Sequence, residues 1–144
     1  MRRVSTLSDL GRLAISPPGM GFLLAAIGLI VWTALSVGAG FGAPEGGFRL
    51  REAWDSSAYF YVGIPVMALA VAAAAFVRPR RAWRWPLWLV GGHQAGVLLV
   101  GLGMQSGFSL ILLTLILAIL LAAFFSIPAL IGSMAARRLM ERAY

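Results

Sequence analysis

Residues 108–134 read FSLILLTLILAILLAAFFSIPALIGSM, a run of 27 residues that contains no Asp, Glu, Lys or Arg. A straight α-helix of that length extends for about 40 Å, whereas the hydrocarbon core of a bilayer is about 30 Å thick. The run is continuously apolar, and the strands of a membrane barrel would instead alternate apolar and polar residues. We therefore expect a transmembrane helix that tilts, bends at Pro128 or extends beyond the bilayer.

Three further uncharged segments have the length of a membrane span. They cover residues 19–39, 58–77 and 86–104, and each supplies the ~20 apolar residues that one crossing needs. The chain of 144 residues is 60% hydrophobic and 12% charged, compared with about 25% charged residues in an average soluble domain. The sequence thus predicts an all-α membrane protein, with residues 1–144 forming a single domain that is a bundle of four transmembrane helices.

The distribution of arginine indicates how the spans are oriented. All 12 basic residues are Arg, and ten of them lie before the first span, between the second and third, or after the fourth. Only Arg49 and Arg51 lie between the first and second spans. Because cytoplasmic loops of membrane proteins carry an excess of basic residues, we expect both termini in the cytoplasm. The Arg-only, Ala- and Gly-rich composition favours a bacterial inner membrane.

Composition also excludes several classes of site. The chain has no cysteine and one His, which excludes disulfides, Cys-ligated zinc and iron–sulfur clusters. A net charge of +7 would suit a nucleic-acid partner, since basic patches neutralise phosphates. The arginines lie in short clusters between apolar segments, however, and we interpret them as contacts to anionic lipids of the inner leaflet. We expect no nucleic-acid partner, no metal and no cofactor.

The most polar pair within a span is His93 and Gln94. An ionisable side chain at membrane depth is costly, so His93 is a functional-site hypothesis: a proton relay, a haem ligand or a quinone contact. The simpler interpretation, which we prefer, is packing through hydrogen bonds to a neighbouring helix. A channel or transporter would instead gather the intramembrane polar residues around water: His93, Gln94, Thr33, Ser36 and Thr114.

Acidic and aromatic residues gather where the first outer loop, residues 40–57, enters the second span. Leu50 and Trp54 are four positions apart, which predicts a short amphipathic helix in the headgroup region. We expect Asp55 to cap the second span, and Trp and Tyr to lie in an interfacial belt. The alternative is a small site that faces the outer compartment, with these members: Arg49, Arg51, Glu52, Trp54, Asp55, Tyr59 and Tyr61.

The segment RPRRAWRW, residues 78–85, combines four arginines with two tryptophans. Arginine binds headgroup phosphates and tryptophan prefers the membrane interface. We therefore expect this segment to anchor the chain in the inner leaflet, through Arg78, Arg80, Arg81, Trp83, Arg84 and Trp85.

Small residues recur four positions apart, as in Gly21 with Ala25 and Gly92 with Gly96. Such pairs let helix backbones approach closely in lipid, which predicts a tightly packed bundle. The same pairs would serve either self-association or the binding of another subunit.

The sequence favours a small, non-enzymatic integral membrane protein. We expect an accessory or structural subunit of a larger complex, or a component that self-associates as a homo-oligomer. No span contains a charged residue, which argues against a transporter built on a membrane-embedded carboxylate. The first alternative is a small oligomeric channel or transporter with a polar path near His93 and Gln94. The second is a membrane anchor subunit that contacts haem or quinone.

Overall fold

The computed structural model describes residues 16–41, 52–103 and 109–142. Within these ranges the structure is helical and has no strand, and four helices are long and apolar enough to cross a membrane. The expected all-helical architecture with four candidate spans is therefore confirmed. The helices are α2 (Pro17–Phe41), α3 (Ile64–Val77), α4 (Arg84–Gly103) and α5 (Ser109–Arg142), and the second candidate span, Tyr59–Val77, consists of α3 and the helical turn before it.

The first long helix begins two residues before the expected span. The backbone N–H of Gly19 donates to Ser16 Oγ over 3.2 Å, so Ser16 satisfies one of the free donors at the start of α2. Pro17 and Pro18 occupy the first turn, where the missing N–H groups have no intrahelical acceptor in any case.

The second span opens with a π-helical turn, Tyr59–Gly63, before α3. The N–H of Ile64 donates to the carbonyl of Tyr59, five residues earlier, and the next residue, Pro65, has no N–H to continue a regular pattern. Ser56 Oγ accepts from the N–H of Ala58 over 3.2 Å. The cap at this end is therefore Ser56, whereas we expected Asp55.

The connection between α2 and the second span contains a short 3-10 turn, Ala53–Asp55, where the sequence predicts an amphipathic helix. Leu50, the other half of that expected apolar face, lies outside the described residues, as do residues 42–51 as a whole. Within the described part of the loop these three residues are helical, and the amphipathic face through Leu50 stays a prediction.

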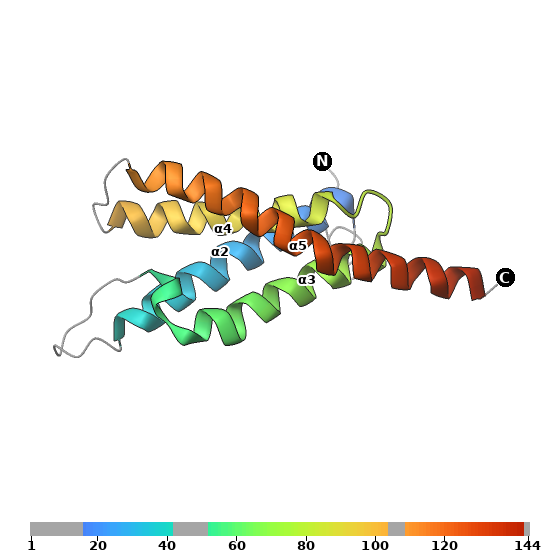
Figure 1. Cartoon of the computed structure of the whole chain (residues 1–144), viewed down its shortest axis with the longest axis horizontal. Coiled ribbons are helices and arrows are strands. Elements are labelled where there is room, and N and C mark those ends of the chain that lie inside the picture. The colour runs from blue at the N-terminus through green and yellow to red at the C-terminus, as the bar shows by residue number, and fades with distance from the viewer. Residues whose placement is uncertain (1–15, 42–51, 104–108, 143–144) are drawn as a thin grey trace, which may run out of the picture.

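The last helix runs without interruption through Pro128 to Arg142, eight residues beyond the expected end at Met134. Ser126 Oγ donates to the carbonyl of Ala122 over 2.8 Å on the turn before the proline. Figure 1 shows the C-terminal part of α5 extending past the other helices. We expected this helix to tilt, to bend at Pro128 or to extend beyond the bilayer, and the structure shows it extending beyond the other helices (Figure 1).

The four helices pack as two pairs. Helix α2 packs chiefly against α4, and α3 chiefly against α5. Figure 1 shows α2 and α4 running in one direction and α3 and α5 in the other, so each pair is parallel and consecutive helices are antiparallel. A Cβ on Gly92 would lie 1.8 Å from the carbonyl oxygen of Ala25, and one on Gly132 would lie 2.2 Å from that of Ala72. Each pair thus crosses at a glycine.

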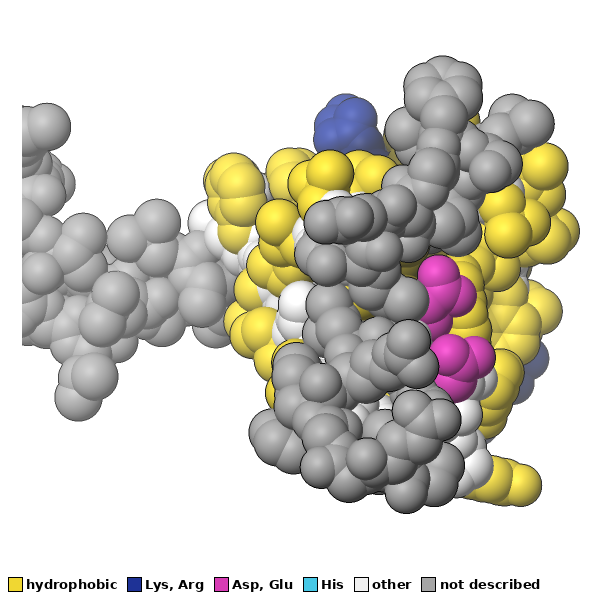
Figure 2. All heavy atoms as spheres, turned by 90° about the vertical axis from the view of Figure 1, so that its left-hand side faces the viewer, with side chains coloured by type: hydrophobic (Ala, Val, Ile, Leu, Met, Phe, Trp, Pro, Cys, Tyr) yellow, Lys and Arg dark blue, Asp and Glu magenta, His cyan; other side chains and the backbone are white. Residues whose placement is uncertain are grey.

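The core is small, and the outer surface is apolar. Trp32, Met67, Leu89 and Phe125 are fully buried between the helices, while large aliphatic side chains such as Leu69 are 71% exposed. Figure 2 shows hydrophobic side chains on the flanks of the bundle and acidic side chains at the end that faces the viewer. Such a surface is compatible with a bilayer, because lipid tails cover apolar flanks that water would not.

Candidate functional site: a buried cluster around His93

His93 lies in a buried aromatic cluster between α2, α4 and the π turn before α3. Its side chain is 1% exposed, and its Nε2 lies 2.9 Å from the hydroxyl oxygen of Tyr59. The ring of Trp32, which is fully buried, packs edge-on against His93 with 4.8 Å between the ring centroids. Trp54 also packs edge-on against Trp32, again with 4.8 Å between the ring centroids. We call these four residues, Trp32, Trp54, Tyr59 and His93, the His93 cluster.

Several polar atoms in and beside this cluster have no hydrogen-bond partner. Nε2 of His93 is engaged with Tyr59, so its Nδ1 is unpaired whichever nitrogen carries the proton. Ser36 lies one helical turn after Trp32 and therefore shares its face of α2. Each unpaired polar atom that is buried costs about 1–3 kcal/mol. Within the described residues, the buried side-chain atoms that lack a partner are Trp32 Nε1, Ser36 Oγ, His93 Nδ1 and Gln94 Nε2.

The structure does not bring the five predicted intramembrane polar residues into one group. The hydroxyl of Thr33 donates to the carbonyl of Leu29 in its own helix. Thr114 is buried on α5, and Gln94 lies next to His93 in sequence, about 100° away around α4. The partner of His93 is instead Tyr59, which we expected in the interfacial belt.

The predicted outer-face cluster divides into two parts. Trp54 and Tyr59 turn inward and belong to the His93 cluster, and the indole N–H of Trp54 donates to the carboxylate of Glu52. Asp55 is exposed, and Tyr61 is 81% exposed. Arg49 and Arg51 lie outside the described residues. The described members therefore form no single acidic and aromatic site.

The two tryptophans of the predicted headgroup anchor have different environments. Trp83 is 61% exposed, with the guanidinium carbon of Arg84 5.3 Å from the centroid of its ring. Trp85 is only 4% exposed, and its indole N–H donates to the carbonyl of Arg78 over 3.2 Å. Trp85 thus closes the connection between α3 and α4, although we expected it at the lipid interface.

All four predicted packing residues lie where α2 meets α4. A Cβ on Gly21 would lie 2.7 Å from the ring of Trp88, and one on Gly96 would lie 3.1 Å from Cβ of Trp32. Gly92 meets the backbone of Ala25, as described above. Close approach of the two backbones therefore depends on these positions having no larger side chain.

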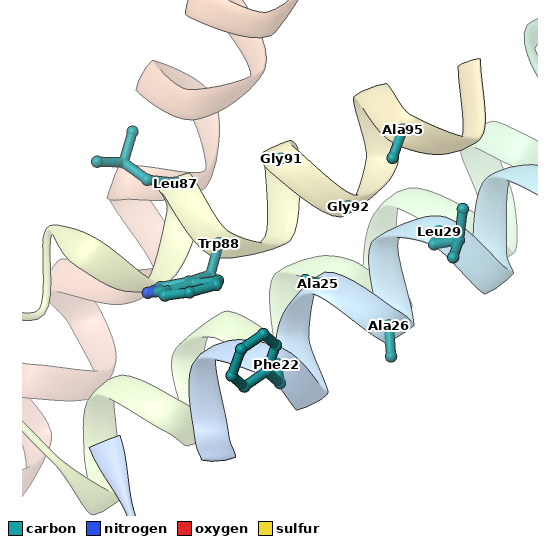
Figure 3. Close-up of a pocket in the computed structure, with 9 residues that line it drawn as sticks. All are labelled: Phe22, Ala25, Ala26, Leu29, Leu87, Trp88, Gly91, Gly92 and Ala95. Carbon is teal, nitrogen blue, oxygen red and sulfur yellow. The ribbon is translucent and has the colours of Figure 1, made fainter. Parts of the chain in front are cut away.

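An apolar hollow of about 640 Å³ lies on the outer side of the same helix pair. We call it the α2/α4 groove. Figure 3 shows that its residues come from these two helices alone, and none of them is charged. The lining consists of Phe22, Ala25, Ala26, Leu29, Leu87, Trp88, Gly91, Gly92 and Ala95.

Within the described residues, no group of three His, Cys, Asp or Glu side chains is arranged to hold a metal ion. Comparisons of the chain with models of protein families, with curated proteins and with solved structures found no match in any of the three.

Proposed function

We propose that this chain is a small, non-enzymatic membrane component that associates with transmembrane helices through the α2/α4 groove. The groove is the observation that carries the proposal. Its lining includes Gly91, Gly92 and three alanines, and the bulkier rings of Phe22 and Trp88 pack against each other beside them, with 5.4 Å between their centroids (Figure 3). In lipid, a surface of small residues lets a second backbone approach closely, and van der Waals packing then drives association.

The occupant that we propose is α5 of a second copy. In α5 only 17% of the apolar window is buried inside the chain, the smallest share among the four candidate spans. Its bulky side chains project outward, with Ile119 71% and Leu120 61% exposed. A ridge of this kind complements a groove of glycine and alanine. Because groove and ridge are different surfaces, the contact is heterologous, and it closes into a ring if the rotation between copies closes.

Gly91 offers a direct test of this association. A Cβ at Gly91 or at Gly101 meets no atom within 4 Å, so Gly91→Leu and Gly101→Leu form a matched pair in which the side chain starts in open space. Only Gly91 lines the groove. We expect Gly91→Leu to give monomers in mild detergent and Gly101→Leu to keep the mass of the unmodified complex. Equal masses for both variants would contradict the proposal, and a co-purifying polypeptide in place of a second copy would identify an accessory subunit instead.

We further infer that both chain ends face the cytoplasm of a bacterial cell, with the inner leaflet supplying anionic lipids around the arginines. The support is the charge asymmetry: Arg80, Arg84 and Arg137 line one hollow at one end of the bundle, and acidic side chains gather at the opposite end. The chain has no cysteine, so single-cysteine variants can be labelled cleanly. In intact cells an impermeant maleimide should label Ser57→Cys but not Leu139→Cys. The reverse pattern would overturn this orientation.

A second candidate function is a channel or transporter with a polar path near His93 and Gln94. The unpaired buried atoms Trp32 Nε1, Ser36 Oγ and His93 Nδ1 favour it, because water in a path would satisfy them. Proton flux into vesicles that contain the purified protein measures this directly. Flux that His93→Leu abolishes, with the fold retained, supports a path. Absence of flux leaves the cluster with a packing role.

A further inference from the structure

Five arginines line a hollow of about 800 Å³ at the end of the bundle where α2 begins and α3 ends. Three come from the connection between α3 and α4, the fourth, Arg84, is the first residue of α4, and the fifth, Arg137, comes from α5. We call this hollow the arginine pocket, and define it by Arg78, Arg80, Arg81, Arg84 and Arg137. The sequence alone groups only the first four, as an anchor along one segment.

The backbone that carries four of these arginines is a closed turn. The indole N–H of Trp85 donates to the carbonyl of Arg78, and the N–H of Arg84 donates to the carbonyl of Arg81 over 3.0 Å. Arg81 has a φ of 63°, a left-handed conformation that costs a non-glycine residue free energy and persists where the surroundings hold it. These arginines are therefore held on a folded turn, and the buried side chain of Trp85 packs against the inner side of that turn.

In the described part of the chain no acidic side chain lies in the pocket, although Glu141 follows Arg137 by four residues on α5. None of the five guanidinium groups forms an ion pair with a described residue. Five like charges around one hollow repel each other, so an anion in that hollow relieves the repulsion. Guanidinium binds phosphate through two parallel hydrogen bonds, which makes phosphate the anion that best fits this lining.

We propose that the arginine pocket binds the headgroup of an anionic phospholipid, and that it prefers a lipid with two phosphates. The pocket lies at one end of the candidate membrane spans, which is where the headgroups of a bilayer crossed by those spans would lie, and Val77 and Met140 add apolar surface beside the arginines. Basic pockets between helix ends are known to select such headgroups. A lipid with two phosphates offsets two of the five charges instead of one, and the pocket offers arginines for them both beside α3 and on α5. This site is separate from the α2/α4 groove and does not depend on the proposed association.

Adjacent arginines on α5 provide a matched pair of variants. Arg137 lines the pocket and Arg138 does not, so Arg137→Gln and Arg138→Gln remove the same charge at the same depth. The purified protein is titrated with cardiolipin, with phosphatidylglycerol or with inorganic phosphate, and bound lipid is counted by native mass spectrometry. We expect one cardiolipin to be retained per chain, and Arg137→Gln to weaken its binding about fivefold, the usual effect of one arginine near an anionic surface. Arg138→Gln should change the binding less than twofold.

Three results would overturn the proposal. Equal weakening by the two variants would indicate general attraction to anionic lipid rather than a site. Equal retention of cardiolipin and phosphatidylglycerol would remove the preference for two phosphates. Displacement of lipid by inorganic phosphate at the same concentration would make the pocket a site for free phosphate. If Arg137→Gln does not fold, Arg80→Gln, an exposed member of the pocket, replaces it in the same comparison.

Discussion

Tyr59 and His93 join the two helix pairs of the bundle. Tyr59 Oη lies 2.9 Å from His93 Nε2, and Tyr59 begins the span that continues into α3, whereas His93 belongs to α4. Because α3 packs chiefly on α5 and α4 chiefly on α2, this hydrogen bond connects the pairs to each other. Trp32 of α2 packs edge-on against both rings, at 5.6 Å from Tyr59 and 4.8 Å from His93.

Removal of the Tyr59 hydroxyl should destabilise the chain modestly. Tyr59→Phe leaves both ring nitrogens of His93 unpaired, and we expect the free energy of unfolding to fall by about 1 kcal/mol, within the range measured for side-chain hydrogen bonds in membranes. His93→Leu should cost a similar amount and leave most of the protein folded. Denaturation of the purified protein in mixed micelles measures both. The double variant should lose less than the sum of the two, and an additive loss would show that the bond has no energetic weight.

Substitution of Gly92 should be far more damaging than substitution of its neighbour. The Cβ of Gly92→Ala would lie 1.8 Å from the carbonyl oxygen of Ala25, so α2 and α4 must separate, and we expect a loss of more than about 3 kcal/mol. Gly91→Ala meets no atom within 4 Å and removes a helical glycine, which should stabilise the chain by up to about 1 kcal/mol. Thermal unfolding followed by circular dichroism separates the two. Similar melting temperatures would contradict the crossing at Gly92.

The second helix pair provides an independent version of the same test. The Cβ of Gly132→Ala would lie 2.2 Å from the carbonyl oxygen of Ala72. That oxygen belongs to the backbone of α3, which cannot move away without separating α3 from α5. We expect a loss of about 2–3 kcal/mol, read from the same thermal unfolding. Gly101→Ala, with open space around its Cβ, is the control. If Gly132→Ala leaves the stability unchanged, α3 and α5 pack less closely than the 2.2 Å approach implies.

The existence of four spans could be predicted because it depends on length and hydropathy alone. Each uncharged segment is long enough to cross a bilayer, and that requirement does not depend on neighbouring helices. The choice of partners could not be predicted in the same way. Helix α3, for example, is apolar on every side, so its sequence marks no face for α5, and Gly132 is one of 17 glycines.

Only part of the His93 cluster could be predicted from the sequence. His93 is conspicuous because an ionisable side chain within a span is rare. Its partner Tyr59 lies at the start of the preceding span, 34 residues away, where an aromatic belt is the ordinary explanation of a tyrosine. The π turn determines which side chains of this segment face α4, because it contains one more residue than a regular helical turn. Pro65 is a sequence signal for an irregular turn, but it does not specify which aromatic ring points inward.

Ser36 distinguishes a packed polar cluster from a water path. Its side chain is fully buried and its hydroxyl has no hydrogen-bond partner, so Ser36→Ala removes a desolvated polar group and should raise the free energy of unfolding by up to about 1 kcal/mol. Ser133→Ala is the matched control, since Ser133 is also buried but its hydroxyl donates to the carbonyl of Leu130 over 2.9 Å. That variant should be neutral or slightly destabilised in the same denaturation experiment. If Ser36→Ala instead destabilises the chain by about 1 kcal/mol, the hydroxyl has a partner such as an internal water. That result would favour the channel or transporter hypothesis over the packing role.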